Sequence, residues 1–227
     1  MSFACVKITA ICPVPLLERV STLLRWKHIH PKFTLDWQGD TLPILAPESH
    51  MLFDTKDQPT PLTPDEEKSL SLAEHRLWKL CEESRNVGVP LLVDAEYLTV
   101  QPAIDYLTYK ASLAFNSHGD GGTLVYGTVQ AYLKDSFARI KLAMDEAAKR
   151  NVPLGIKLVR GAYIVRETAL ASTLGLPSPI HACIQDTHKC YDKSASFLLE
   201  SAVANKGCVV LATHNMESGT KKVIVFG

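Results

Sequence analysis

The sequence lacks the features that mark several common classes of protein. It contains no run of about 18 apolar residues, so no membrane-spanning helix is expected. Its 24 basic and 24 acidic residues cancel, and this balance argues against nucleic acid as a partner, because such partners require clustered Lys and Arg. No H-x-x-x-H, H-E-x-x-H or C-x-x-C pair occurs, so no metal site is expected.

The N-terminus also lacks the marks of a targeting segment. Met1–Ile8 begins a strand pattern, with no basic segment, no long apolar segment and no Arg/Ser-rich amphipathic stretch. We therefore expect no signal or transit peptide within this chain. Six cysteines are present, several of them beside Val, Ile or Leu, and they are interpreted as reduced core cysteines of a non-secreted protein.

What the sequence does contain is a regular alternation of strand and helix patterns. The 227 residues suit one large domain, and a hydrophobic fraction of 46% is sufficient for a core. Strands are expected near residues 4–9, 89–96, 123–130, 153–159 and 208–215, with helices between them. Thr63, Pro64 and Glu66 predict a capping box at one helix start. Residues 28–62 are dotted with proline and are expected to form an irregular surface insertion.

Five strand–helix repeats predict an α/β fold with a parallel sheet. Polar residues recur where the strands end, which is where both (β/α)₈ barrels and doubly wound sheets carry their ligands. A doubly wound sheet usually has a glycine-rich phosphate loop after its first strand, and none follows Lys7. A (β/α)₈-type, TIM-like barrel is therefore favoured, with about five β/α units in this chain.

The segment Lys157–Tyr163 carries the strongest signal of a site. Lys157 and Arg160 interrupt and close an apolar strand, and a buried cation is costly unless it is paired or bonded to an anion. An anionic or strongly polar group is expected at this strand end. Plainer interpretations stay open: one of the two cations in a surface salt bridge, Tyr163 as a core aromatic, or His214 as a core histidine.

Asp94 and Glu96 end another apolar strand and point to the same side of it. A structural ion pair and a site role are both consistent with that pattern, and Glu96 serves equally well as a support for its neighbours. The glycine cluster at residues 119–122 lacks the spacing of a phosphate loop and is interpreted as a plain loop.

Several strand-end segments, taken together and in order, resemble the proline dehydrogenase (proline oxidase) family. Their residues resemble the plant branch of that family most. The matching segments are Val6–Ala10, Leu92–Glu96 with Gln101–Ile104, Val129–Lys134, Lys157–Tyr163 and Ala212–Asn215. The resemblance implies a distorted (β/α)₈ barrel that holds FAD. It also implies oxidation of L-proline to Δ1-pyrroline-5-carboxylate, a quinone electron acceptor, a mitochondrial location and peripheral association with the inner mitochondrial membrane.

Site roles follow from the same resemblance. Catalytic or substrate-lining roles fall to Lys7, Asp94 and Tyr163, and cofactor contacts fall to Gln130, Lys157, Arg160, Ala162, Thr213, His214 and Asn215. Some bacterial members have Arg at the position of Lys157 and Lys at that of Arg160, which keeps the charge and changes the hydrogen-bonding geometry.

The resemblance also predicts where the chain departs from the family. Residues 1–227 are expected to form a single partial barrel, and residues 219–227 look like a divergent tail. The family's later portion holds a Tyr and two adjacent Arg that clamp the proline carboxylate, and no Arg-Arg dipeptide occurs in this sequence. A catalytically impaired truncated isoform acting as a binding or regulatory protein, a flavin-free lyase or hydrolase, and a hydroxyproline dehydrogenase are the alternatives.

Overall fold

The protein is built on one five-stranded parallel sheet. The computed structural model describes residues 2–49, 57–119 and 122–215. The sheet contains β1 (Ala4–Val6), β2 (Leu91–Val93), β3 (Val125–Gln130), β4 (Leu154–Val159) and β5 (Gly207–Leu211), and the strands neighbour one another in chain order. In a doubly wound sheet the order of the strands reverses at a switch point, whereas in the wall of a β/α barrel the strands follow one another in chain order. The predicted parallel α/β fold is confirmed.

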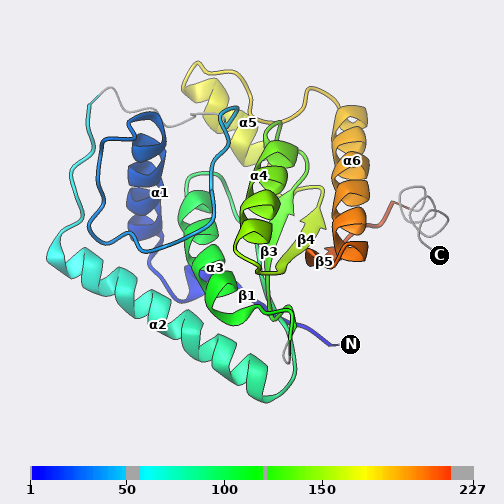
Figure 1. Ribbon diagram of the computed structural model, residues 1–227. Helices are drawn as coiled ribbons and strands as arrows, with labels where there is room; N and C mark the ends of the chain where they lie inside the picture. The colour runs from blue at the N-terminus through cyan, green and yellow to red at the C-terminus, as the bar shows by residue number, and fades with distance from the viewer. Residues whose placement is uncertain (1, 50–56, 120–121, 216–227) are drawn as a thin grey trace.

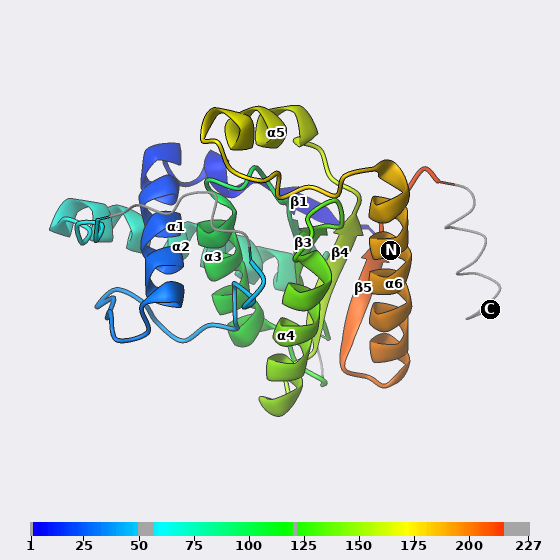
Figure 2. The same cartoon turned by 90° about the horizontal axis from the view of Figure 1, so that it is seen from above.

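The helices cover one face of the sheet and one end of it. They are α1 (Val14–Ile29), α2 (Pro64–Asn86), α3 (Gln101–Phe115), α4 (Ser136–Lys149), α5 (Ile164–Thr173) and α6 (Ile184–Val203), with a 3-10 turn, η1, at Ile8–Ala10. Figure 1 shows α1, α3, α4 and α6 in a row, with α2 crossing below α1 and α3. In Figure 2, α5 lies across the end toward which the strands run. None of the helices in the described parts of the chain has the length and apolar run needed to cross a membrane.

The start of α2 has the capping box that the sequence predicts. The Thr63 hydroxyl accepts a hydrogen bond from the Glu66 N–H at 3.3 Å, and the Glu66 carboxylate accepts one from the Thr63 N–H at 2.8 Å. The bond from the Thr63 backbone, with lesser help from Arg19, lowers the pKa of Glu66. Two backbone donors that the helix cannot satisfy itself are therefore satisfied locally.

The hydrophobic core lies between the sheet and the helix row. Its sheet side consists of the strand residues that point toward the helices, among them Leu91, Val125 and Ile156. Its helix side consists of apolar residues of α1, α2, α3, α4 and α6. Asn116 is 6% exposed and fixes the lower end of this layer: its amide donates to Val125 O and Pro153 O and accepts from the N–H groups of Leu124 and Val125, at 2.8–3.1 Å. All four of its hydrogen-bonding positions are thus used.

The opposite face of the sheet carries side chains in layers. The pairing register places Cys5, Leu92, Tyr126, Gly155 and Cys208 in one row. Alternation places the next inward-facing residues two positions later, among them Asp94, Thr128 and Lys157. A β-carbon on Gly155 would meet Val125 O at 2.6 Å and Tyr126 Cγ at 2.8 Å, so this glycine makes room for the Tyr126 ring. This row lies below the polar row, and its three central members, Leu92, Tyr126 and Gly155, are buried.

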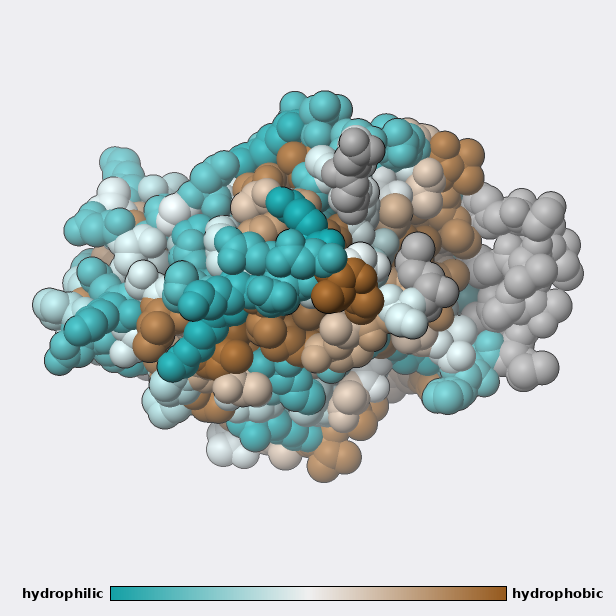
Figure 3. Space-filling view, turned by 90° about the horizontal axis from the view of Figure 1, so that it is seen from below, coloured by the Kyte–Doolittle hydropathy of each residue, from teal (hydrophilic) through white to brown (hydrophobic). Residues whose placement is uncertain are grey.

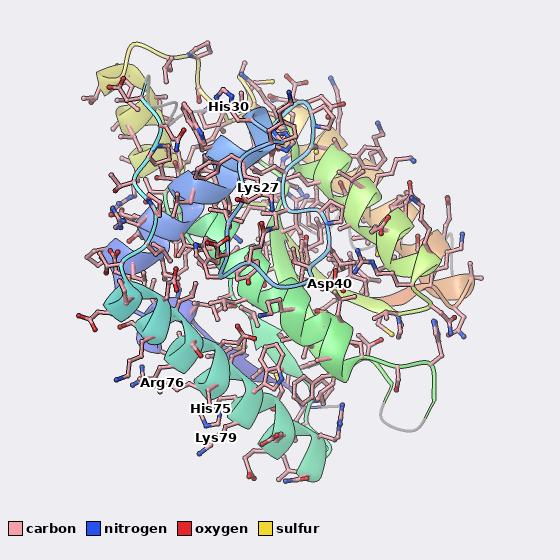
Figure 4. All side chains as sticks on the ribbon, turned by 60° about the vertical axis from the view of Figure 1, so that its left-hand side comes forward. Lys27, His30, Asp40, His75, Arg76 and Lys79 are labelled. Atoms are coloured by element: carbon pink, nitrogen blue, oxygen red, sulfur yellow. The ribbon has the colours of Figure 1, made fainter. Side chains whose placement is uncertain are left out.

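The segment between α1 and α2 is tied to the helices that it crosses. Leu42 and Ala46 are each 1% exposed and contribute to the core. Figure 4 shows Lys27 at the end of α1 and Asp40 on the loop that follows. The Lys27 ammonium donates to Gln38 Oε1 at 2.5 Å, and Asp40 accepts from Arg150 at the end of α4 at 2.7 Å.

The outer surface is mixed in character. Figure 3 shows the face on which α2 lies as mostly hydrophilic, with apolar side chains gathered toward its middle. Figure 4 shows His75, Arg76 and Lys79 projecting outward from α2. The Arg76 guanidinium also donates to Ile11 O at 2.8 Å and so links α2 to the end of η1.

The six cysteines are unpaired, but they are not all core residues. Cys12 and Cys81 are buried, and burial raises their thiol pKa values to about 11 and about 12. Cys5, Cys183 and Cys208 are exposed, so the expectation of core cysteines is wrong for these three. Two of them lie on the edge strands β1 and β5, where an apolar neighbour in the sequence does not imply burial.

We expect Gly155→Ala to lower the free energy of unfolding by about 1–3 kcal/mol, because the added methyl overlaps a strand carbonyl and the Tyr126 ring. Urea denaturation followed by circular dichroism measures the loss. Gly119→Ala is the matched control, since nothing lies within 4 Å of the position its β-carbon would take. Equal stability of the two variants would contradict the packing argument.

Candidate active site

A group of polar side chains lies at the carboxyl ends of the strands. They surround a cavity of about 460 Å³, large enough for a small ligand or for the reactive part of a cofactor. Its lining comes from the ends of all five strands, from the turn that leads into α5, and from α6. The lining residues are Lys7, Asp94, Ala95, Thr128, Gln130, Lys157, Val159, Arg160, Gly161, Ala162, Tyr163, His188, Ala212, Thr213, His214 and Asn215.

An ion pair crosses the floor of this cavity. The Lys157 ammonium on β4 donates to the Asp94 carboxylate after β2 at 2.8 Å, although β3 lies between the two strands. Both side chains are partly exposed, at 18% and 26%, and so face the cavity. The ion pair compensates the cation that interrupts the apolar strand, and the anion predicted for this strand end is Asp94.

Glu96 connects neighbouring segments at the strand ends and does not line the cavity. It is 5% exposed, and its carboxylate accepts from the Thr9 hydroxyl at 2.8 and 3.0 Å. Its backbone N–H donates to Gln101 Oε1 at 2.7 Å. Of the two roles considered for Glu96, a site role and support of its neighbours, the structure favours support. Glu96 joins the turn after β1 to the segment before α3.

Gln130 spans the ends of three strands. Its amide Nε2 donates to Glu96 O at 2.9 Å, and its Oε1 accepts from the Ala162 N–H at 3.1 Å. The side chain is 3% exposed, so these bonds have no competition from bulk water. One neutral amide thus sets the spacing between the loops that follow β2 and β4.

Gly161 allows the chain to turn sharply at the cavity rim. Its φ of 138° lies in a region that side chains disfavour, and a β-carbon there would lie 2.5 Å from the Tyr132 ring. The turn ends β4 at Val159 and frees Arg160 from the strand alternation. Lys157 and Arg160 therefore reach the same cavity.

Lys7 and Tyr163 face each other across the mouth. Partial burial alone would lower the pKa of Lys7, but Tyr163, Glu96 and Asp94 outweigh that effect and together raise it. Tyr163 contributes through both charge and a hydrogen bond. Lys7 is therefore held as a cation beside the Lys157–Asp94 pair.

The helix α5 roofs one side of the mouth. The buried carboxylate of Glu167 accepts from the Leu98 N–H at 2.7 Å, while Arg25 donates to Leu98 O. This holds Tyr97 in place, with its ring 5.9 Å from the Tyr163 ring and under the Arg166 guanidinium at 3.7 Å. The segment after β2 and the start of α5 are thereby fixed against each other.

The structure brings all ten predicted site residues into the one cavity. Lys7, Asp94, Tyr163, Gln130, Lys157, Arg160, Ala162, Thr213, His214 and Asn215 all line it. Their individual chemical roles stay predictions. Sequence reasoning missed His188 and Thr128, which also line the cavity: Thr128 could have been found from its place two residues before Gln130, whereas His188 lies inside a helix pattern that gives no such signal.

The sequence profile described as "Proline dehydrogenase" matches residues 3–225. The chain belongs to the proline dehydrogenase family. It is 49% identical over 215 residues to proline dehydrogenase 1, mitochondrial, of Arabidopsis thaliana, covering 94% of this chain and 43% of that protein. It is 31% identical to the hydroxyproline dehydrogenase of Homo sapiens, over 93% of this chain and 45% of that protein. The chain thus spans less than half the length of these relatives.

Solved structures agree with this fold. The proline utilization A protein of Bdellovibrio bacteriovorus, inactivated by N-propargylglycine, aligns with all of this chain and 24% of its own, at a TM-score of 0.64 and 20% identity. A Bradyrhizobium japonicum proline utilization A mutant aligns with 70% of this chain and 16% of its own, at 0.60 and 23%. At these identities the likeness supports the proline dehydrogenase fold only. The predicted divergent tail, residues 219–227, lies outside the described residues.

Gln130→Leu should lower the free energy of unfolding by about 1–3 kcal/mol, because it leaves the buried Glu96 carbonyl and Ala162 N–H without partners. Hydrogen–deuterium exchange should report faster exchange at the Ala162 amide. Gln185→Leu, on the exposed face of α6, is the matched control and should change neither quantity. An unchanged Ala162 amide would refute the bridging role.

Tyr163→Phe should lower the pKa of Lys7, because it removes the largest raising contribution while burial continues to lower it. A raised lysine pKa stabilises the fold below the ordinary value of 10.5, and that stabilisation is lost as the pH rises through the folded value. NMR titration of the Lys7 ε-carbon, assigned with Lys7→Arg, measures the shift. Tyr126→Phe, in the lower row, should leave it unchanged.

Proposed function

We propose that this chain carries the FAD and L-proline site of a proline dehydrogenase. The observation that supports this most is the convergence of all ten family-matched residues on one cavity at five successive strand ends. Mitochondrial location is proposed from the relatives' names, and a quinone acceptor from the family resemblance.

The donor set of the cavity fits a flavin. Lys157 and Arg160 provide positive charge, Gln130 provides an amide, and Thr213, His214 and Asn215 provide polar groups at the end of β5. A bound flavin would supply the two-electron acceptor for oxidation of the ring carbon next to the proline nitrogen. The cations would stabilise the negative charge that such an acceptor gains.

The remaining residues suit an amino-acid substrate. Asp94 offers a carboxylate to a substrate ammonium group, while the Lys157 bond holds that carboxylate in orientation. Lys7 and Tyr163 lie where they can exchange a proton or orient the ring. The roof of α5, fixed through Glu167 and Leu98, limits access of water from one side.

Hydroxyproline is the second candidate substrate. The 31% identity to a hydroxyproline dehydrogenase over 93% of this chain favours keeping it. The two substrates differ by one hydroxyl, and a site that bonds that hydroxyl rejects the analogue lacking it. Parallel assays with both substrates separate the two candidates.

Expression of residues 1–227 tests the proposal. We expect flavin absorbance in the purified protein and proline-dependent reduction of a dye. Asp94→Ala should reduce turnover by at least about tenfold, since the carboxylate partner of the substrate is lost. Asp145→Ala removes an exposed carboxylate paired with Lys141 and serves as the control.

A folded protein that binds no added FAD and shows no turnover would contradict the proposal. It would favour instead the alternative of a binding or regulatory chain. Pull-down with a longer relative then tests that alternative directly.

A further inference from the structure

Arg160 is held from three sides at the rim of the cavity. Its Nε–H donates to His188 Nδ1 at 2.9 Å, and its Nη1 donates to the Thr213 hydroxyl. The face of its guanidinium lies 4.2 Å from the centroid of the Tyr191 ring. Two edges and one face of a planar group are thus fixed by residues outside the β4 turn that carries it.

The helix α6 supplies two of these three contacts. His188 and Tyr191 are three residues apart, so they project from the same side of the helix. Tyr191 is 1% exposed and lies in the core, which makes it a rigid support. His188 lines the cavity itself. The helix therefore places one supporting ring and one hydrogen-bond acceptor around the same guanidinium.

The Arg160 bond fixes the chemical form of His188. A guanidinium has donors only, so His188 Nδ1 must present a free lone pair. The imidazole is then neutral, with its proton on Nε2. A doubly protonated ring would offer no acceptor and would bring a second positive charge against Arg160.

We propose that His188 is a positioning residue, whose unprotonated Nδ1 holds the Arg160 guanidinium in the plane that faces the cavity. It acts through Arg160. Without it, Arg160 keeps the Thr213 bond and the Tyr191 contact but can rotate about the bond to Nε. The part of this inference that concerns cofactor affinity rests on the proposed function, and the part that concerns guanidinium orientation does not.

Two variants separate a positioning role from simple packing. His188→Asn keeps an acceptor, because its Oδ1 can take the place of Nδ1. His188→Leu keeps an apolar body of similar reach and removes the acceptor. If only the hydrogen bond matters, Asn should rescue what Leu loses.

NMR of the full chain without added ligand measures the orientation directly. In the wild type, the Arg160 Nε–H, assigned by its absence in Arg160→Lys, should exchange slowly with water. The His188 nitrogen shifts should report a proton on Nε2 alone. Exchange should stay slow in His188→Asn and become at least about tenfold faster in His188→Leu. Fast exchange in the wild type, a proton on Nδ1, or equal loss in both variants would overturn the proposal.

Titration with FAD measures the functional consequence. We expect affinity about tenfold weaker in His188→Leu and within about threefold of wild type in His188→Asn. Unchanged affinity in the Leu variant would overturn the cofactor part. If the wild-type chain binds no FAD, the proposed function fails, while the NMR measurements still decide whether His188 orients Arg160.

Discussion

The carboxyl edge of the sheet depends on one electrostatic constraint. Lys157 and Arg160 bring two positive charges within three residues to the end of a largely apolar strand, and each must be compensated there. The chain uses a different solution for each. Lys157 has a carboxylate from two strands away, and Arg160 has neutral acceptors and an aromatic face.

This arrangement requires the loops after the strands to hold fixed distances. Neutral amides and buried carboxylates serve that purpose, and none of them lines the cavity except Gln130. Glu96 and Gln101 tie the first two strand ends, and Gln130 ties these to the turn before α5. Since each of these groups is buried and bonded, displacement of any one would leave a polar atom unsatisfied. The hydrogen bonds of these buried groups therefore keep the rim of the cavity rigid.

The sequence could predict this architecture because strand–helix alternation and inward–outward alternation are local patterns. Knowing that the sheet is parallel places every strand end at the same edge, so Lys7, Asp94 and Lys157 had to lie near one another. Three kinds of feature escaped prediction. His188 depends on the rotation of α6 against the sheet. Glu96 follows the same strand as Asp94, and only the turn after β2 decides which carboxylate faces the cavity. Cys208 is exposed because β5 is an edge strand, which no pattern within its own segment reveals.

The order of the two cations follows from the number of partners that each must satisfy. Lys157 forms one bond to one carboxylate, and a compact ammonium is sufficient for that. Arg160 donates in two directions within one plane while its face rests on Tyr191. A lysine at this position has neither a second planar donor nor a flat face to stack. Exchanging the two would preserve the charge of the cavity and leave either His188 or Thr213 without its donor. The partners supplied by α6 and the end of β5 therefore specify arginine at 160, and the single carboxylate of Asp94 leaves 157 to lysine.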